Sequence, residues 1–176
     1  PVSVLLCSTF WEVSKLKILF MSGGQRELAL RHLLENGEQV VAVITPRITN
    51  ENRRFEKVVL TAIEFGIPVF PVTRKDMSTH IDSIDFDILV SCGFPYRIER
   101  HIIEKAKYAI NVHPTLLPQY RGFRSGPYII LNNEKQTGTT IHFLTEGMDK
   151  GDIILQKAFN ISIFDTTRSI FRKNKE

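Results

Sequence analysis

Residues 17–45 read KILFMSGGQRELALRHLLENGEQVVAVIT, and this stretch contains one complete strand–helix–strand unit. The apolar run 17–21 predicts a short strand, and the leucine spacing of 25–35 predicts a helix. The leucines expected on one side of this helix are Leu28, Leu30, Leu33 and Leu34. Gly37 follows as a C-cap glycine does, and the β-branched run 39–45 is typical of a strand buried on both faces.

The same alternation continues along the rest of the chain. Further helices are predicted at 55–65, 98–107 and 125–132, and further strands at 67–70, 87–91, 108–112, 139–144 and 152–159. Strands that alternate with helices of about ten residues favour βαβ units. We therefore expect an α/β fold with an open, mainly parallel sheet and helices on both faces, in one domain at residues 17–163.

The composition places the chain among ordinary globular proteins. Of its 176 residues, 43% are hydrophobic and 24% charged, which excludes a disordered tail, a collagen-like fibre and a coiled coil. No run approaches the roughly 18 apolar residues of a transmembrane helix, so no membrane partner is expected. Cys7 and Cys92 are too few for a disulfide framework and fit a reducing compartment. We expect a cytoplasmic protein.

The net charge of +4 raises the question of nucleic-acid binding. The basic residues crowd into the polar stretch 47–54 and the last nine positions, with no aromatic residues interleaved in a basic stripe. No helix-turn-helix, zinc-finger or RNP-like pattern is present, so DNA is not an expected partner. An anionic small substrate suits the same charge.

Both ends of the sequence indicate a piece of a longer protein. The chain begins at Pro1, and 1–16 forms an N-terminal segment of uncertain role, because its apolar part lacks the basic flank of a signal peptide. At the other end, 164–176 opens like a capped helix that stops after two turns. We expect the catalytic domain to be truncated at its C-terminus.

In open α/β sheets, ligands bind beyond the carboxyl ends of the strands. That rule selects four segments: 22–24, 46–52, 92–97 and the residues from 111 onward. Ser22-Gly23-Gly24 follows a strand and opens a helix, so its backbone N–H groups could meet an anion. It matches neither a dinucleotide fingerprint nor a P-loop, and a plain tight turn is the alternative.

The segment 111–122, NVHPTLLPQYRG, is the densest in chemistry. Asn111 and His113 point to the same side of an extended chain and would place an amide beside an imidazole. A structural histidine is the alternative for His113. Asp149 lies in a glycine-flanked loop, where it is either a turn residue or, if the loop folds back to His113, the partner of an imidazolium.

Three segments together resemble the folate-dependent formyltransferase family: 111–122, TGTTIHF at 137–143 and DKGDIILQ at 149–156. A looser likeness extends over residues 17–97 and includes GIPV at 66–69. The resemblance implies a Rossmann-like domain that transfers a formyl group from 10-formyltetrahydrofolate to a primary amine. No metal is needed for this chemistry.

The resemblance also implies residue roles. Asn111 and a cationic His113 would donate hydrogen bonds to the negative oxygen of a tetrahedral intermediate, while Asp149 would stabilise the imidazolium and help relay the amine proton. The residues expected to bind the folate are Gly93, Phe94, Arg97, Ile98, Leu144, Thr145, Glu146 and Gly147, although Phe94 and Ile98 fit an ordinary core equally well. The residues expected to bind the amine substrate are Ser22, Gly23, Arg121 and Gly122.

The chain departs from individual family patterns. The turn usually written Asn-Gly-Glu is Asn132-Asn133-Glu134, which Asn tolerates, and 123–126 lacks the Ala-Ala-Pro of methionyl-tRNA enzymes. Ser22-Gly23-Gly24 differs from the phosphate loop of the purine enzyme. We expect the acceptor to be an amino group on a nucleotide-linked sugar. The alternatives are methionyl-tRNA, which requires a further C-terminal domain, glycinamide ribonucleotide, hydrolysis of the same folate, and a catalytically silent folate-binding module.

Overall fold

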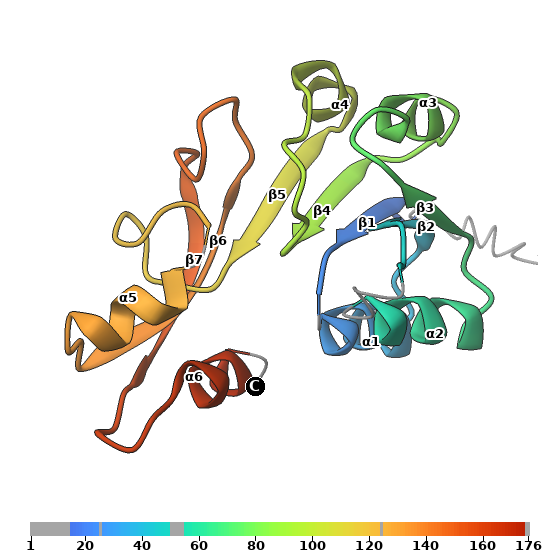
Figure 1. Cartoon of the computed structure of the whole chain (residues 1–176). Helices are drawn as coiled ribbons and strands as arrows, with labels where there is room; N and C mark the ends of the chain where they lie inside the picture. Colours follow the sequence, from blue (N-terminus) through green and yellow to red (C-terminus); the bar gives the residue numbers. More distant parts are fainter. Residues whose placement is uncertain (1–14, 25, 50–54, 124, 175–176) are drawn as a thin grey trace, which may run out of the picture.

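Seven strands form a single sheet in the order β3-β2-β1-β4-β5-β6-β7, as Figure 1 shows for this computed structural model. The structure describes residues 15–24, 26–49, 55–123 and 125–174, so most of the expected N-terminal segment and part of the loop 46–52 lie outside the described residues. The strands are β1 Ile18–Ser22, β2 Val40–Pro46, β3 Val69–Val72, β4 Ile88–Cys92, β5 Tyr108–His113, β6 Gln136–Phe143 and β7 Ile153–Asn160. The helices are α1 Glu27–Glu35, α2 Glu56–Glu64, α3 Met77–Asp82, α4 Arg100–Lys105, α5 Ser125–Leu131 and α6 Thr167–Lys173.

Strands β1 to β5 are all parallel, whereas β6 and β7 are antiparallel to their neighbours. The chain runs outward from β1 to β3, then returns to place β4 on the other side of β1. This reversal of strand order makes the carboxyl ends of β1 and β4 the topological switch point, where such sheets bind ligands. The expected open, mainly parallel sheet is confirmed.

Helices cover both faces of the parallel part of the sheet (Figure 1). One core cluster lies between the sheet and α1 and α2, and it includes Phe20, Leu30 and Val58. The other lies against α3 and α4 and includes Leu19 and Ile102. Successive β1 side chains alternate between the two clusters, which explains why this strand is apolar at every position.

The first helix follows its prediction with one exception. Leu30 is fully buried, but Leu28 is 47% exposed. Two positions along a helix correspond to more than half a turn, so Leu28 and Leu30 cannot share a face. Gly37 has a φ of +73° and its N–H donates to Leu34 O, so it ends α1 as the sequence predicts.

One short helix was not predicted from the sequence, and one predicted helix is confirmed. The short helix α3 falls where no helix was expected. At the C-terminal end, Thr166 and Ser169 form a capping box at the start of α6, which confirms the predicted capped helix. Within the described residues, no helix is long and apolar enough to cross a membrane.

Candidate active site

The carboxyl end of β5 and the loop between β6 and β7 bring Asn111, His113 and Asp149 together. Asn111 and His113 stand two residues apart on β5, so their side chains lie on the same face of the strand. One Asp149 carboxylate oxygen, Oδ1, lies 3.4 Å from Asn111 Nδ2, and the other, Oδ2, lies 3.3 Å from His113 Nδ1. Asp149 therefore folds back to His113, the arrangement that spacing alone left open.

Both ring nitrogens of His113 face oxygen acceptors. Nε2 lies 2.9 Å from the backbone oxygen of Tyr120, and Nδ1 faces Asp149. Only an imidazolium carries a hydrogen on both nitrogens, so this pair of acceptors suits the cationic ring. His113 can reach a substrate oxygen only by sharing one of these two N–H groups.

A second histidine, His142, also reaches the carboxylate. It lies on β6 directly opposite Asn111 and is 1% exposed. Its Nε2 lies 3.1 Å from Asn111 Nδ2 and 3.5 Å from Asp149 Oδ1. The sequence analysis did not include His142 in the site, because only the β5–β6 register brings it there.

The backbone also holds the Asp149 carboxylate. The Gly122 N–H donates to Oδ2 at 2.7 Å, and Arg121 Nε donates to the Asp149 backbone oxygen at 2.9 Å. Burial raises the pKa of Asp149, but contact with His142, the hydrogen bond from the Gly122 N–H and the charge of His113 together outweigh burial. The pKa therefore lies below its usual 3.8, and the group is an anion at neutral pH.

A side-chain cluster supports the loop that follows β5. The Tyr120 hydroxyl donates to Glu134, and Asn132 Nδ2 donates to the Tyr120 hydroxyl at 2.9 Å. Tyr120 has a φ of +56°, so its carbonyl is presented to His113 from an unusual backbone conformation. Asn133 has a φ of +52°, which confirms that Asn takes the left-handed position in this turn.

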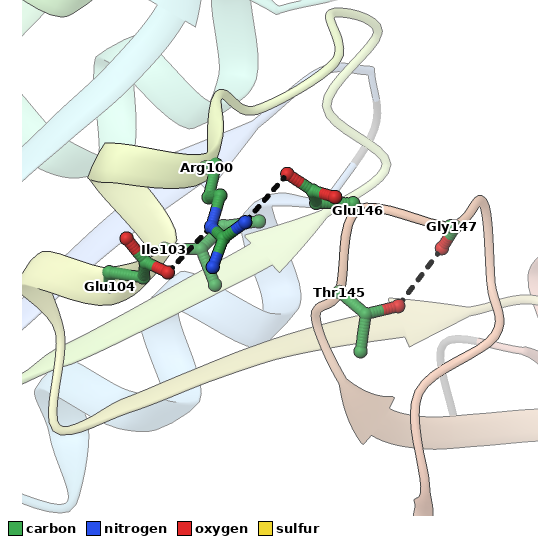
Figure 2. Close-up of a pocket in the computed structure, with 6 residues that line it drawn as sticks. All are labelled: Arg100, Ile103, Glu104, Thr145, Glu146 and Gly147. Carbon is green, nitrogen blue, oxygen red and sulfur yellow. Dashed lines mark hydrogen bonds and ion pairs between the residues drawn. The ribbon is translucent and has the colours of Figure 1, made fainter.

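The two loops expected to hold the folate lie side by side. Arg97 donates to the backbone oxygen of Glu146 at 3.3 Å, and Arg100 forms an ion pair with the Glu146 carboxylate at 3.8 Å. Figure 2 shows Arg100 extended between Glu104 on its own helix and Glu146 on the opposite loop. A hollow at this junction is lined by Arg100, Ile103, Glu104, Thr145, Glu146 and Gly147.

Three of these lining residues were expected and three were not. Thr145, Glu146 and Gly147 belong to the predicted folate loop, whereas the others come from α4. Positions 100, 103 and 104 share one face of a helix, and that spacing is the signal that could have indicated them. Of the remaining expected folate residues, Ile98 is 8% exposed within the core and Phe94 packs edge-on against Tyr96.

Ser22 and Gly23, at the end of β1 and in the turn that follows, make close contacts within the protein. Ser22 is fully buried and its hydroxyl donates to the Cys92 backbone oxygen at 3.3 Å. A Cβ on Gly23 would lie 2.5 Å from the Gly93 backbone oxygen, and a Cβ on Gly93 would lie 2.9 Å from Gly23 O. The loops after β1 and β4 therefore meet backbone to backbone, and both glycines are required by this close approach.

Comparison with known proteins gives concordant results. A family model described as formyl transferase matches residues 16–176. The methionyl-tRNA formyltransferase of Bacillus cereus strain B4264 is 34% identical over 173 residues, covering 92% of this chain and 54% of that protein. The chain thus spans about half the length of the curated relatives it matches.

Solved structures agree with the sequence relatives. Phosphoribosylglycinamide formyltransferase from Bacillus halodurans is 25% identical, with a TM-score of 0.77 over 90% of this chain and 87% of that one. The sugar 3N-formyl transferase WlaRD, determined in the presence of dTDP and 5-N-formyl-THF, is 27% identical, with a TM-score of 0.72 over 91% of this chain and 57% of that one. By its fold and by the match over almost its whole length, this chain belongs to the formyl transferase family.

Proposed function

We propose that residues 17–163 form the catalytic domain of an enzyme that transfers a formyl group from 10-formyltetrahydrofolate to a primary amine. The observation that carries this proposal is the Asp149 carboxylate, which contacts Asn111, His113, His142 and the Gly122 N–H at once. An anion held among hydrogen-bond donors can stabilise a neighbouring imidazolium and take part in proton transfer. Membership of the formyl transferase family supports the reaction class.

The residues near the hollow fit a folate. A flat heterocycle needs an apolar wall and backbone groups at its edge. Phe94 and Leu144 pack against the edge of the core, while Thr145 and Glu146 are exposed on the adjoining loop. We assign the folate to Gly93, Phe94, Arg97, Ile98, Leu144, Thr145, Glu146 and Gly147, with Ile98 contributing to the apolar floor. When bound, 10-formyltetrahydrofolate supplies a formyl carbon that an amine can attack.

The residues of the site have separate roles around that carbon. Asn111 and His113 donate toward the formyl oxygen, where negative charge develops. Asp149 stabilises the imidazolium form of His113 and accepts the proton that the amine gives up. That proton passes to the folate nitrogen, which leaves as its bond to the formyl carbon breaks. Arg121 is exposed beside the site and meets a substrate anion, while Gly122 leaves room for the amine and positions Asp149 through its N–H.

The comparisons support two candidate acceptors. Methionyl-tRNA is supported by the curated relatives at 34% identity, and an amino sugar is supported by the sugar formyl transferase structure at 27%. Methionyl-tRNA is thus supported at least as well as the amino sugar that the sequence analysis favours. The acceptor is therefore assigned as a primary amine and its identity is left to a direct assay.

The first test is calorimetric binding of a non-reactive 10-formylfolate analogue, followed by transfer to methionyl-tRNA, an amino-sugar nucleotide and glycinamide ribonucleotide. We expect saturable binding, transfer to one acceptor, and loss of roughly 100-fold or more of that rate in Asn111→Ala and His113→Ala. His101→Ala is the control, because His101 is 52% exposed and its ring faces Asp82 and Glu99 instead of Asp149. Binding without transfer to any acceptor would instead support a silent folate-binding module, and survival of activity in either variant would refute the assigned roles.

A further inference from the structure

His142 is a buried titratable group that the proposed reaction does not yet use. Its Nδ1 lies 2.8 Å from the Phe143 backbone oxygen, which can only accept a hydrogen bond. Nδ1 therefore carries a hydrogen in every protonation state, and the hydrogen that can come and go is the one on Nε2.

That variable nitrogen belongs to a triangle of polar atoms. His142 Nε2 lies 3.1 Å from Asn111 Nδ2 and 3.5 Å from Asp149 Oδ1, and the last two atoms lie 3.4 Å apart. An amide nitrogen can only donate and a carboxylate can only accept. In the described arrangement Nε2 is thus the acceptor, and both Asn111 N–H groups face inward, toward His142 and Asp149.

This arrangement conflicts with the role assigned to Asn111, which requires an N–H group toward the substrate. A hydrogen on His142 Nε2 removes the conflict. The ring then donates to Asp149. If the Asn111 amide kept its orientation, its Nδ2 donor would lie 3.1 Å from the Nε2 donor of His142, which is unfavourable. Turning the amide over gives up the Asn111 hydrogen bond to Asp149 Oδ1, places the amide oxygen against the His142 N–H and frees the NH2 group to face outward.

We propose that His142 is a positioning residue whose Nε2 hydrogen selects which end of the Asn111 amide faces the substrate. This inference rests on the proposed function for its consequence: with the hydrogen present, Asn111 offers a donor to the formyl oxygen, and without it Asn111 offers an acceptor. The charged groups facing His142 are Asp149, from the β6–β7 loop, and His113, from β5, which contacts the other carboxylate oxygen of Asp149.

The direct test is ¹⁵N NMR of the histidine rings and side-chain amides of the unliganded protein between about pH 5 and pH 9, where imidazoles titrate. We expect the Asn111 NH2 resonances to shift with the same midpoint as His142 Nε2. In His142→Gln the pH dependence of the Asn111 signal should vanish, whereas it would persist if it arose from His113 or Asp149. A flat Asn111 signal in the wild type, or a His142 ring that does not titrate, would overturn the proposal.

Kinetics provide the second readout. His142→Gln should lower kcat by up to about 100-fold with little change in KM for the folate, and should remove the limb of the kcat–pH profile that follows His142. An unchanged profile shape with a uniform loss of rate would indicate a purely structural role. Because the NMR test uses no substrate, failure of formyl transfer itself would leave the Asn111–His142 coupling independently testable.

Discussion

The Asp149 side chain is only 12% exposed, yet it stays ionised because its two oxygens contact polar groups on three separate segments. Desolvation alone would push a carboxyl toward its neutral form. Here the Gly122 N–H, His142 and the charge of His113 together reverse that effect, so the pKa of Asp149 falls below its usual value. The carboxylate is thus both the electrostatic centre of the site and a contributor to stability.

The lowered pKa of Asp149 predicts a pH-dependent contribution to folding. Between the folded pKa and the unfolded value of about 4, the unfolded state binds more protons, so stability rises with pH there. The contribution of Asp149 is therefore complete above about pH 4 and is lost as the pH falls through the folded pKa. Urea unfolding of wild type and Asp149→Asn should show a stability difference that shrinks at acid pH, and a constant difference down to about pH 2 would contradict this.

Asp149→Asn should also lower formyl transfer by about 10² to 10⁴-fold, because an amide cannot balance an imidazolium or accept a proton. Transfer rates at saturating folate measure the effect. Asp152→Asn is the matched control, since this carboxylate lies in the same loop and is exposed. Equal losses in both variants would show that loop geometry, and not the charge of Asp149, limits the rate.

At the scale of elements, the crossing of the loops after β1 and β4 is sensitive to a single methyl group. A Cβ on Gly23 would lie 2.5 Å from both Gly93 O and Pro95 Cδ. We expect Gly23→Ala to lower the free energy of unfolding by about 1–3 kcal/mol, as overpacking does. Gly24→Ala is the comparison: its φ is +101°, but no atom lies within 4 Å of the added methyl, so backbone strain alone should cost about 1 kcal/mol. Equal costs would argue against the close approach.

The N-cap of α6 offers a second test on one element. Thr166 accepts a hydrogen bond from the Ser169 N–H, and the Ser169 hydroxyl accepts one from the Thr166 N–H. Thr166→Ala should destabilise the protein by about 1 kcal/mol, whereas Thr166→Ser keeps the cap and should cost much less. Thermal unfolding of both variants measures the difference, and an equally large loss for Ser would assign the effect to the methyl group instead.

Most elements could be predicted because their periodicity is local. The apolar run 39–45 and the glycine after α1 carry their own signals, and both appear in the structure as β2 and its preceding cap. Helix α3 could not be predicted in the same way. It has six residues, fewer than two turns, and Asp76 at its start makes no side-chain cap, because its carboxylate accepts from the Thr73 N–H.

At the scale of the whole molecule, the exposure of the strands predicts a gradient of local stability. Every β1 residue is buried between two neighbouring strands, whereas β7 is an edge strand exposed along nearly its whole length. Amide hydrogens of β1 should exchange at least about 10-fold more slowly than those of β7. Native-state exchange read by mass spectrometry tests this, with β3 as the other edge. Equally slow exchange in β7 would mean that this edge is covered in solution, and dilution would show whether a second copy covers it.

The candidate active site was only partly predictable at this scale. The spacing of Asn111 and His113 on one strand indicates that their side chains lie together, and the resemblance to a family adds Asp149. His142 lies within the 137–143 motif, but that motif gave it no role in the site, since it meets Asn111 across 31 positions of sequence through strand pairing. The α4 residues of the hollow were missed for the same reason: they join the site only when the loop at 144–147 lies beside that helix.

Because Asn111 is paired with His142 across the β5–β6 ladder, the chain between these strands leaves and re-enters the sheet at fixed points. Within residues 114–135, the stretch 115–122 is tied by backbone hydrogen bonds to Thr140, Gln156 and Asp149. The rest of this connection can gain or lose length without moving the ladder that pairs Asn111 with His142. The segment 115–122 supplies the Tyr120 carbonyl that receives His113 and the Gly122 N–H that holds Asp149, so both groups must keep their places. In evolutionary terms, this separation lets the outer part of the connection diverge by insertion and deletion while the pairing of β5 with β6 stays in place.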